Sequence, residues 1–206
     1  MVNREFWKQR IEQAWRERPI LWLTGVRRVG KTTLARNLED AAYHDCELPR
    51  VRRRIEEDPE GFLDQAASPR LVLDEIHRLE NPSELLKIAA DHFPELRILA
   101  TGSSTLGASH RFRDTLAGRK REVHLLPVLF RELPAFGADL ETRLLHGGLP
   151  ENLAAKGFPE KDFAEWMDAF WARDIQELFR LEKRAVFIRL LELLLTQSGQ
   201  LCELAS

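Results

Sequence analysis

A glycine-rich segment between an apolar run and a helical pattern most constrains how this chain folds. Residues 25–32 read GVRRVGKT, in which two glycines separated by four residues precede a lysine and a hydroxyl residue. The apolar run Ile20–Thr24 predicts a buried strand before it, and apolar spacing from Lys31 to Ala42 predicts a helix after it. Backbone amides can turn inward around phosphate groups only where glycine permits the turn and the close approach. The segment therefore predicts a phosphate-binding loop.

Each residue type in this loop has an expected task toward ATP or ADP. Lys31 is expected to neutralise the β- and γ-phosphates, and the hydroxyl of Thr32 to ligate Mg²⁺. The helix that opens at Lys31 directs its positive end at the same anion. The residues expected to contact the nucleotide in this loop are Gly25, Val26, Arg27, Arg28, Val29, Gly30, Lys31, Thr32 and Thr33.

Two adjacent acids follow a second apolar run. The segment LVLDE places Asp74 and Glu75 at the end of a predicted strand over Leu71–Leu73. Ligands of open α/β sheets bind at the carboxyl ends of the strands, so these acids are expected to face the phosphate loop. Asp74 is the candidate for the magnesium shell, and Glu75 for orienting and polarising the attacking water of a hydrolase. Alone, the pair would be an ordinary strand end.

Two further residues are candidates on weaker patterns. A third predicted strand, Arg97–Thr101, precedes Gly102-Ser103-Ser104, where a hydroxyl is expected to contact the γ-phosphate or the water, with Ser103 ahead of Ser104. A plain turn is the competing interpretation. Arg119 stands at the end of a predicted helix, where an arginine can stabilise transition-state charge in its own or a neighbouring subunit. A solvated surface arginine is the alternative.

The order of the elements predicts an α/β fold. Strands at 20–24, 71–73, 97–101 and 122–130 alternate with helices, which favours a mainly parallel sheet covered on both faces. This is the three-layer αβα sandwich of P-loop NTPases. After about Phe136 the chain predicts helices only, and we expect a small all-helical lid there.

Composition limits the classes of function. The 206 residues are 44% hydrophobic and 31% charged, as in ordinary folded domains, and the net charge of −2 argues against a surface built wholly for nucleic acid. Two distant cysteines and an N-terminus without a signal-peptide core predict a cytoplasmic protein, and no apolar run predicts a membrane span.

The ordered set GVRRVGKTT, LVLDEIH, ILATGSS, LAGR, LLPVLFREL and GGLPE resembles a group of prokaryotic AAA-type ATPases. That group is similar to the archaeal ATPases and, more distantly, to the STAND class of signalling NTPases. The resemblance implies an ATPase core over residues 1–136 with an N-terminal helix at 1–18, a lid over 137–190, and a winged helix cut short at 191–206. It also implies that Gly148 and Pro150 pack against adenine, that Ser103 is a sensor, and that Arg119 is an arginine finger.

Several functions stay open on the sequence alone. The leading hypothesis is Mg²⁺-dependent hydrolysis of ATP to ADP and phosphate for an unknown protein client. A homo-oligomer is one assembly that this hypothesis allows for the chain. The alternatives are a slow, STAND-like nucleotide switch and a DNA-associated regulator, whose DNA contacts are expected through a missing C-terminal region. A nucleic-acid module using the arginines of 50–54 and 111–121 is disfavoured by the intervening acids. A small-molecule kinase is disfavoured by Glu75 beside Asp74, and GTP preference by the lack of an Asn-Lys-x-Asp motif.

Overall fold

A computed structural model describes residues 2–102, 116, 118–155, 157, 160–176 and 183–200 of the chain. The chain divides into two compact units, Met1–Phe163 and Ala164–Ser206. The first unit contains the whole sheet and every motif discussed below. The two units are described separately.

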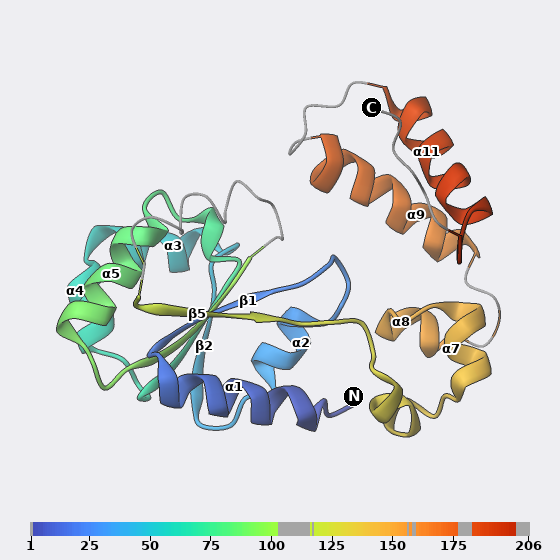
Figure 1. The fold of residues 1–206 in the computed structure, drawn as a ribbon. Helices are drawn as coiled ribbons and strands as arrows, with labels where there is room; N and C mark the ends of the chain where they lie inside the picture. The colour runs from blue at the N-terminus through green and yellow to red at the C-terminus, as the bar shows by residue number, and fades with distance from the viewer. Residues whose placement is uncertain are drawn as a thin grey trace. The chain divides into compact units, whose positions relative to one another are not determined.

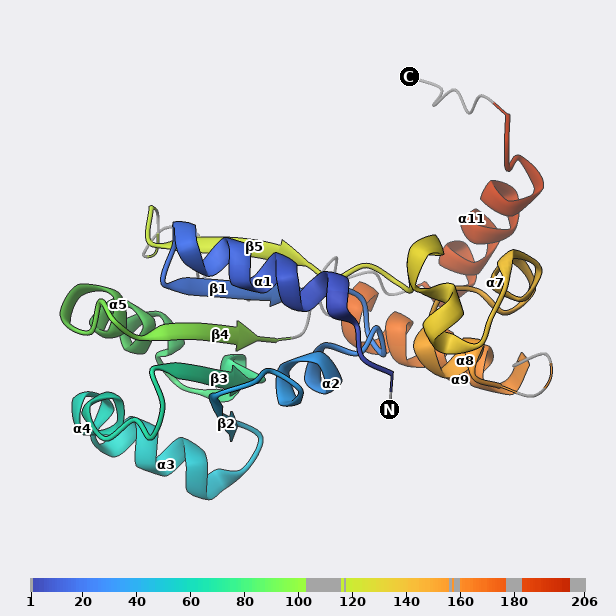
Figure 2. The same ribbon diagram turned by 90° about the horizontal axis from the view of Figure 1, so that it is seen from below.

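A five-stranded parallel sheet forms the centre of the first unit, in the order β2-β3-β4-β1-β5. Its strands all point toward the same edge (Figure 2). The carboxyl ends of β1, β3 and β4 therefore lie next to one another, as ligand binding in open α/β sheets requires. The strands are β1 Ile20–Thr24, β2 Ala41–Asp45, β3 Arg70–Asp74, β4 Arg97–Thr101 and β5 Lys120–His124.

Helices cover both faces of this sheet, which confirms the predicted three-layer αβα sandwich (Figure 1). Alternate residues of β1, β3 and β4 enter different apolar clusters: in β1, Ile20 and Trp22 join one, and Leu21 and Leu23 the other. The Trp22 side packs against α3 to α5, and the Leu21 side against α1 and α2. The helices are α1 Glu5–Glu17, α2 Lys31–Arg36, α3 Pro49–Glu57, α4 Pro59–Asp64 and α5 Pro82–His92.

The expected helix from Lys31 to Ala42 is wrong in its second half. Helix α2 ends at Arg36, and the chain reaches β2 after Asp40, whose backbone φ is +53°. Strand β2 lies at the edge of the sheet and every one of its residues is only partly buried. An edge strand lacks the continuous apolar run that marks a buried one, so its alanines were compatible with a continuing helix.

Past β5 the described residues of both units form helices and turns only. The first unit continues with η2 Phe130–Phe136, α7 Leu140–His146 and α8 Pro150–Leu153. Helix α9, Glu160–Phe170, crosses the division between the units and is followed by η3, Trp171–Ile175, and α11, Arg184–Thr196. The boundaries expected for the lid and the winged helix stay predictions, and residues 201–206 lie outside the described part of the chain.

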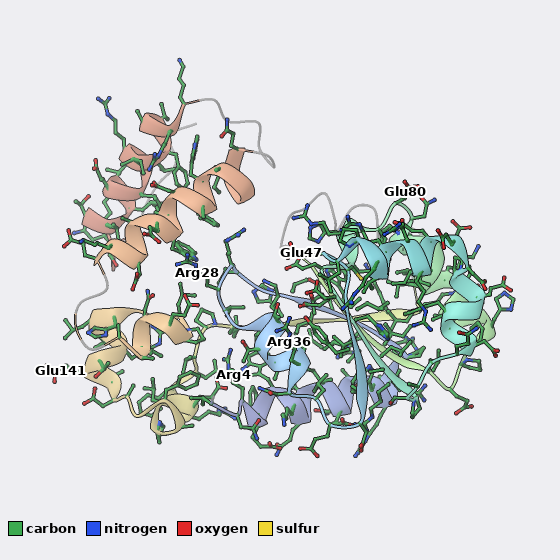
Figure 3. The ribbon with its side chains drawn as sticks, turned by 180° about the vertical axis from the view of Figure 1, so that it is seen from behind. Arg4, Arg28, Arg36, Glu47, Glu80 and Glu141 are labelled. Atoms are coloured by element: carbon green, nitrogen blue, oxygen red, sulfur yellow. The ribbon has the colours of Figure 1, made fainter. Side chains whose placement is uncertain are left out.

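A buried ion pair joins the N-terminal segment to the chain beyond β5. Arg4 binds Glu132 through Nε–Oε1 at 3.0 Å and Nη2–Oε2 at 2.8 Å, and the two side chains are only 5% and 7% exposed. Arg4 also donates to the carbonyl oxygens of Val29 and Leu126, while Trp7 Nε1 lies 3.4 Å from Glu132. One guanidinium thus connects the N-terminus, the loop after β1 and the segment after β5. Figure 3 labels Arg4 in this position.

This pair predicts a pH-dependent contribution to stability. Burial alone would raise the pKa of Glu132, but the hydrogen bond from Arg4, the Leu129 amide and the Arg4 charge outweigh it and lower the pKa. A lowered pKa in the folded state means that the stabilisation is complete above the unfolded pKa of about 4.5 and is lost as pH falls further. Glu132→Gln should cost about 3–5 kcal/mol at pH 7, because it leaves a buried charge unpaired.

Urea unfolding of wild type and variant from pH 7 to pH 3 measures this difference, which should shrink below about pH 4.5. Glu141→Gln, at an exposed position on α7, is the control and should stay close to wild type at every pH. A constant difference between wild type and Glu132→Gln would contradict the ionic role.

Candidate functional site: the phosphate loop and the ends of three strands

The loop between β1 and α2 has the backbone conformations that its glycines permit. Gly25 has a φ of +142° and Gly30 a φ of +96°, both unfavourable for residues with a side chain. A Cβ at Gly25 would lie 2.4 Å from the carbonyl oxygen of Leu125, at the end of the adjacent strand. Arg28, at the outer bend, has a φ of +61° without being glycine, and Figure 3 labels its side chain there. The close contact between Gly25 and the Leu125 carbonyl, directly after β5, determines where the loop begins.

Lys31, the first residue of α2, turns its ammonium group back across the loop. Nζ donates to the carbonyl oxygen of Gly25 at 2.8 Å and to that of Val26 at 3.2 Å. The loop is anchored beneath by Val29, which is fully buried and whose carbonyl oxygen receives the Arg4 guanidinium. The positive charge thus lies over the glycine-rich turn, where an anion bound by the loop would meet it.

Asp74 ends β3 and is 97% buried. Both of its carboxylate oxygens accept hydrogen bonds from hydroxyl groups on neighbouring strands. Tyr43 of β2 donates to Oδ2 at 2.6 Å, and Thr101 of β4 donates to Oδ1. The carboxylate is therefore held in one orientation at the sheet edge that carries the phosphate loop.

Glu75 follows in a left-handed backbone conformation, with a φ of +54° that is rare for a residue with a side chain. Its amide donates to Thr101 Oγ1 at 3.0 Å, and its carboxylate lies 3.1 Å from Nδ1 of His77. The Nδ1 atom of His77 is buried against this carboxylate. Burial would raise the pKa of Glu75, but His77 and the charges of Lys31 and Arg78 outweigh it and lower the pKa. Glu75 is therefore ionised at neutral pH.

The Gly148-Leu149-Pro150 turn lies beside the phosphate loop. Pro150 begins α8, and a Cβ on Gly30 would lie 3.8 Å from its ring. The amide of Val128 donates to the carbonyl oxygen of Gly148 at 2.8 Å, which fixes the turn to the segment after β5. Pro150 and the start of α2 border a cavity of about 260 Å³. Its lining includes Arg4, Gly30, Thr33, Asn37, Phe136 and Pro150.

The other two candidates have different outcomes. Ser103 lies outside the described residues, as does most of the helix expected over Phe112–Ala117, so the sensor assignment stays a prediction. Arg119 is described, and its guanidinium forms a two-point contact with Asp91 of α5, at 2.7 and 3.1 Å. Both side chains are about one-third exposed.

Sequence reasoning missed four side chains that contact the loop or the acids. Thr101 belonged to the hydroxyl-rich segment that was singled out, but Ser103 was preferred. Tyr43 is the only tyrosine of the chain, yet its strand was not recognised. His77 follows the acids in the quoted LVLDEIH without a signal for its role, and nothing in the sequence connects Arg4 with Val29.

A phosphate loop between strand and helix in a parallel αβα sandwich, with acids at the end of another strand of the same sheet, defines the P-loop NTPase class. Comparison with known families agrees: a family model described as an AAA domain matches residues 17–134. The chain belongs to this AAA domain family.

Proteins similar to this chain include Rv2008c of Mycobacterium tuberculosis and Mb2031c of Mycobacterium bovis, both named as uncharacterised. Each is 30% identical over 187 residues, which are 86% of this chain and 41% of the relative. This chain thus spans about two fifths of the length of these relatives. Among solved structures, the Walker-type ATPase PABY2304 of Pyrococcus abyssi has a TM-score of 0.55 at 20% identity, covering 96% of this chain and 77% of that protein. That similarity concerns the fold.

Among the helices that the structure describes, none is long and apolar enough to cross a membrane.

The contact at Gly25 predicts the effect of the smallest side chain. Gly25→Ala should lower the free energy of unfolding by about 2 kcal/mol or more, because the methyl group meets a backbone carbonyl and the φ is strained. Thermal and urea unfolding measure the change. Gly157→Ala is the matched control, since a Cβ there has nothing within 4 Å and its φ is not in the strained region. Equal stability of the two variants would show that the loop does not need glycine at position 25.

Proposed function

We propose that this chain binds ATP with Mg²⁺ and hydrolyses it to ADP and phosphate. The observation that carries this proposal is the convergence of the Lys31 loop with Asp74 and Glu75 at one sheet edge. The charge of Lys31 helps to lower the pKa of Glu75, so the two groups interact across the site. Membership of the AAA domain family supports nucleotide binding in particular.

The residues around the loop suit magnesium. Mg²⁺ prefers hard oxygen ligands and is usually held by one or two carboxylates, water and substrate phosphates. Asp74 and the Thr32 hydroxyl supply such oxygens. Among the described residues no group of three or more His, Cys, Asp or Glu could hold a metal by itself. A site completed by the phosphates of ATP is therefore the arrangement that these residues would support. The ion would offset phosphate charge there.

The adenine base would occupy the cavity beside Pro150. The cavity adjoins Gly30 and Thr33, so a base there would be connected to phosphates in the loop without crossing the sheet. Leu34 and Phe136 provide apolar surface, and Asn37 a polar group that can read a base edge. In this arrangement the Gly148–Pro150 turn would pack against adenine, as the family resemblance implies.

Hydrolysis would use Glu75 to orient and polarise water. The Glu75 carboxylate is ionised and partly buried. The backbone amide of Glu75 donates a hydrogen bond to the Thr101 hydroxyl, which restrains the position of the residue. Glu75 thus holds a negative oxygen near the phosphate loop, where it can accept a hydrogen bond from the attacking water.

Glu75→Gln should separate binding from turnover. The amide keeps the shape of the side chain but is a poor proton acceptor, so hydrolysis should fall about 100-fold or more while ATP affinity stays near wild type. Phosphate release and titration with a fluorescent ATP analogue measure the two properties. Lys31→Ala is the contrasting variant, since without the ammonium charge nucleotide binding itself should be lost. Wild-type turnover in Glu75→Gln would reduce Glu75 to a strand-end acid, and ATP binding by Lys31→Ala would contradict the phosphate-loop assignment.

We further propose that Arg119 serves a neighbouring subunit's nucleotide. Its guanidinium is partly exposed and contacts an exposed aspartate, so it is not committed to the interior of its own chain. The Asp91 contact is at the surface, where water and salt screen an ion pair and leave it weak. An incoming γ-phosphate would therefore compete with it readily.

Arg119→Ala should keep ATP affinity but lower hydrolysis, by up to about 10³-fold if the residue is a finger. Arg121→Ala, two residues further on and paired with Glu17, is the matched control and should retain activity. Mixing Arg119→Ala with Lys31→Ala should restore some hydrolysis, because an intact loop then meets an intact arginine. If wild-type activity per molecule is independent of concentration and the mixture stays inactive, the role in a neighbouring subunit is wrong.

A further inference from the structure

Asp74 is held from the side of the edge strand by a phenol. The strand register pairs Tyr43 with Val72, two residues before Asp74, so Tyr43 and Asp74 lie on the same face of the sheet. The long tyrosine side chain spans that offset and places Oη 2.6 Å from Oδ2. Thr101 approaches the other oxygen, Oδ1, from the opposite strand. Each oxygen of the Asp74 carboxylate therefore accepts a hydrogen bond from a neighbouring strand.

Tyr43 is the donor in its bond. Burial, followed by the hydrogen bond to Asp74, raises the pKa of Tyr43 far above the neutral range, so the hydroxyl keeps its proton. The Arg36 guanidinium lies over the ring, with Cζ 4.8 Å from the ring centre, and 3.7 Å from the Asp45 carboxylate. Arg36 belongs to α2, the helix that begins at Lys31, and Figure 3 labels it there. Tyr43 thus connects Asp74 with the phosphate-loop helix.

Two hydroxyl donors fix the plane of a carboxylate. Each oxygen has two lone-pair directions, and Tyr43 and Thr101 occupy one on each oxygen. The remaining directions are then set by the protein before any ion arrives. Partners that orient a metal-binding group in this way typically change metal affinity about 10- to 100-fold when they are removed.

We propose that Tyr43 is a positioning residue for magnesium, which orients Asp74 toward the ion's shell and couples that orientation to the phosphate-loop helix through Arg36. The inference rests on the proposed ATP–Mg²⁺ function. It assigns a task to edge strand β2, which carries none of the motif residues.

The test is Tyr43→Phe, which keeps the ring and its contact with Arg36 and removes only the hydroxyl. The Mg²⁺ concentration for half-maximal binding of a fluorescent ATP analogue should rise about 10-fold. Affinity for the same analogue in EDTA should not change, because the loop and Lys31 are intact. A residue with a merely structural role would lower thermal stability and weaken binding equally with and without Mg²⁺.

Two variants control the experiment. Thr142→Val removes a hydroxyl that donates to Asp139 at 2.7 Å on α7, and it should leave the Mg²⁺ dependence unchanged. Asp74→Asn should by itself raise the Mg²⁺ concentration needed for half-maximal binding of the analogue. Adding Tyr43→Phe to Asp74→Asn should have little further effect on that concentration, since the two side chains act as one unit.

A spectroscopic readout is independent of any variant. Tyr43 is the only tyrosine, so tyrosine labelled with ¹³C at Cζ yields one signal, which should move when Mg²⁺ is added to the ATP-bound protein. An unchanged Mg²⁺ requirement in Tyr43→Phe, or additive losses in the double variant, would overturn the inference while leaving the ATPase proposal intact. Wild-type protein that does not bind the ATP analogue at all would instead overturn the proposed function.

Discussion

Parallel pairing around β1 is the constraint on which the site depends. Strand β1 lies between β4 and β5, and β3 pairs on the far side of β4. Because every strand runs in the same direction, the loop after β1, the acids after β3 and the hydroxyl that ends β4 reach one edge together. Backbone hydrogen bonds continue past the ends of the outer strands: the Cys46 amide, after β2, donates to the carbonyl oxygen of Asp74 at 2.9 Å, and the Leu125 amide, after β5, donates to that of Thr24 at 2.9 Å. The site is thus assembled from strand ends.

The phosphate loop is also held from outside the sheet. The buried Arg4–Glu132 pair carries a desolvation cost, which its hydrogen bonds to Val29, Leu126 and Leu129 offset. These contacts fasten the N-terminal segment to the base of the loop and to the segment that leads toward the Gly148–Pro150 turn. Two parts of the first unit that are distant in sequence therefore share the walls of one cavity. Movement of either would change the shape of the proposed base site.

The two acids at the carboxyl end of β3, Asp74 and Glu75, differ in how their side chains are held. Asp74 is held by hydrogen bonds from Tyr43 and Thr101, whereas the contact described for the Glu75 carboxylate is with Nδ1 of His77, at 3.1 Å. Thr101 contacts both residues, since its hydroxyl accepts from the Glu75 amide and donates to Asp74. A carboxylate that holds a metal shell benefits from rigidity, and one that handles water benefits from some freedom. The arrangement matches the separate roles proposed for the two acids.

Prediction from sequence succeeded where a pattern is local. The apolar runs of β1 and β4 have the predicted bounds, because buried strands need continuous apolar residues, and the loop glycines lie where their unusual φ angles are required. It failed at β2, whose partly buried residues follow no strand period. It also chose Ser103 over Thr101, because spacing along the chain does not show which hydroxyl faces Asp74.

The sequence by itself therefore determined the class of fold, the phosphate loop and the two adjacent acids at the carboxyl end of β3. Those features depend on short-range requirements: glycine for the turn, apolar runs for buried strands, and charge beside phosphate. Only the tertiary structure decided that Tyr43 and Thr101 grip Asp74, that Arg4 binds the carbonyl of Val29, and that Arg119 rests on Asp91. These contacts join residues from 25 to 31 positions apart, and their formation depends on strand order and helix packing, which no local pattern records.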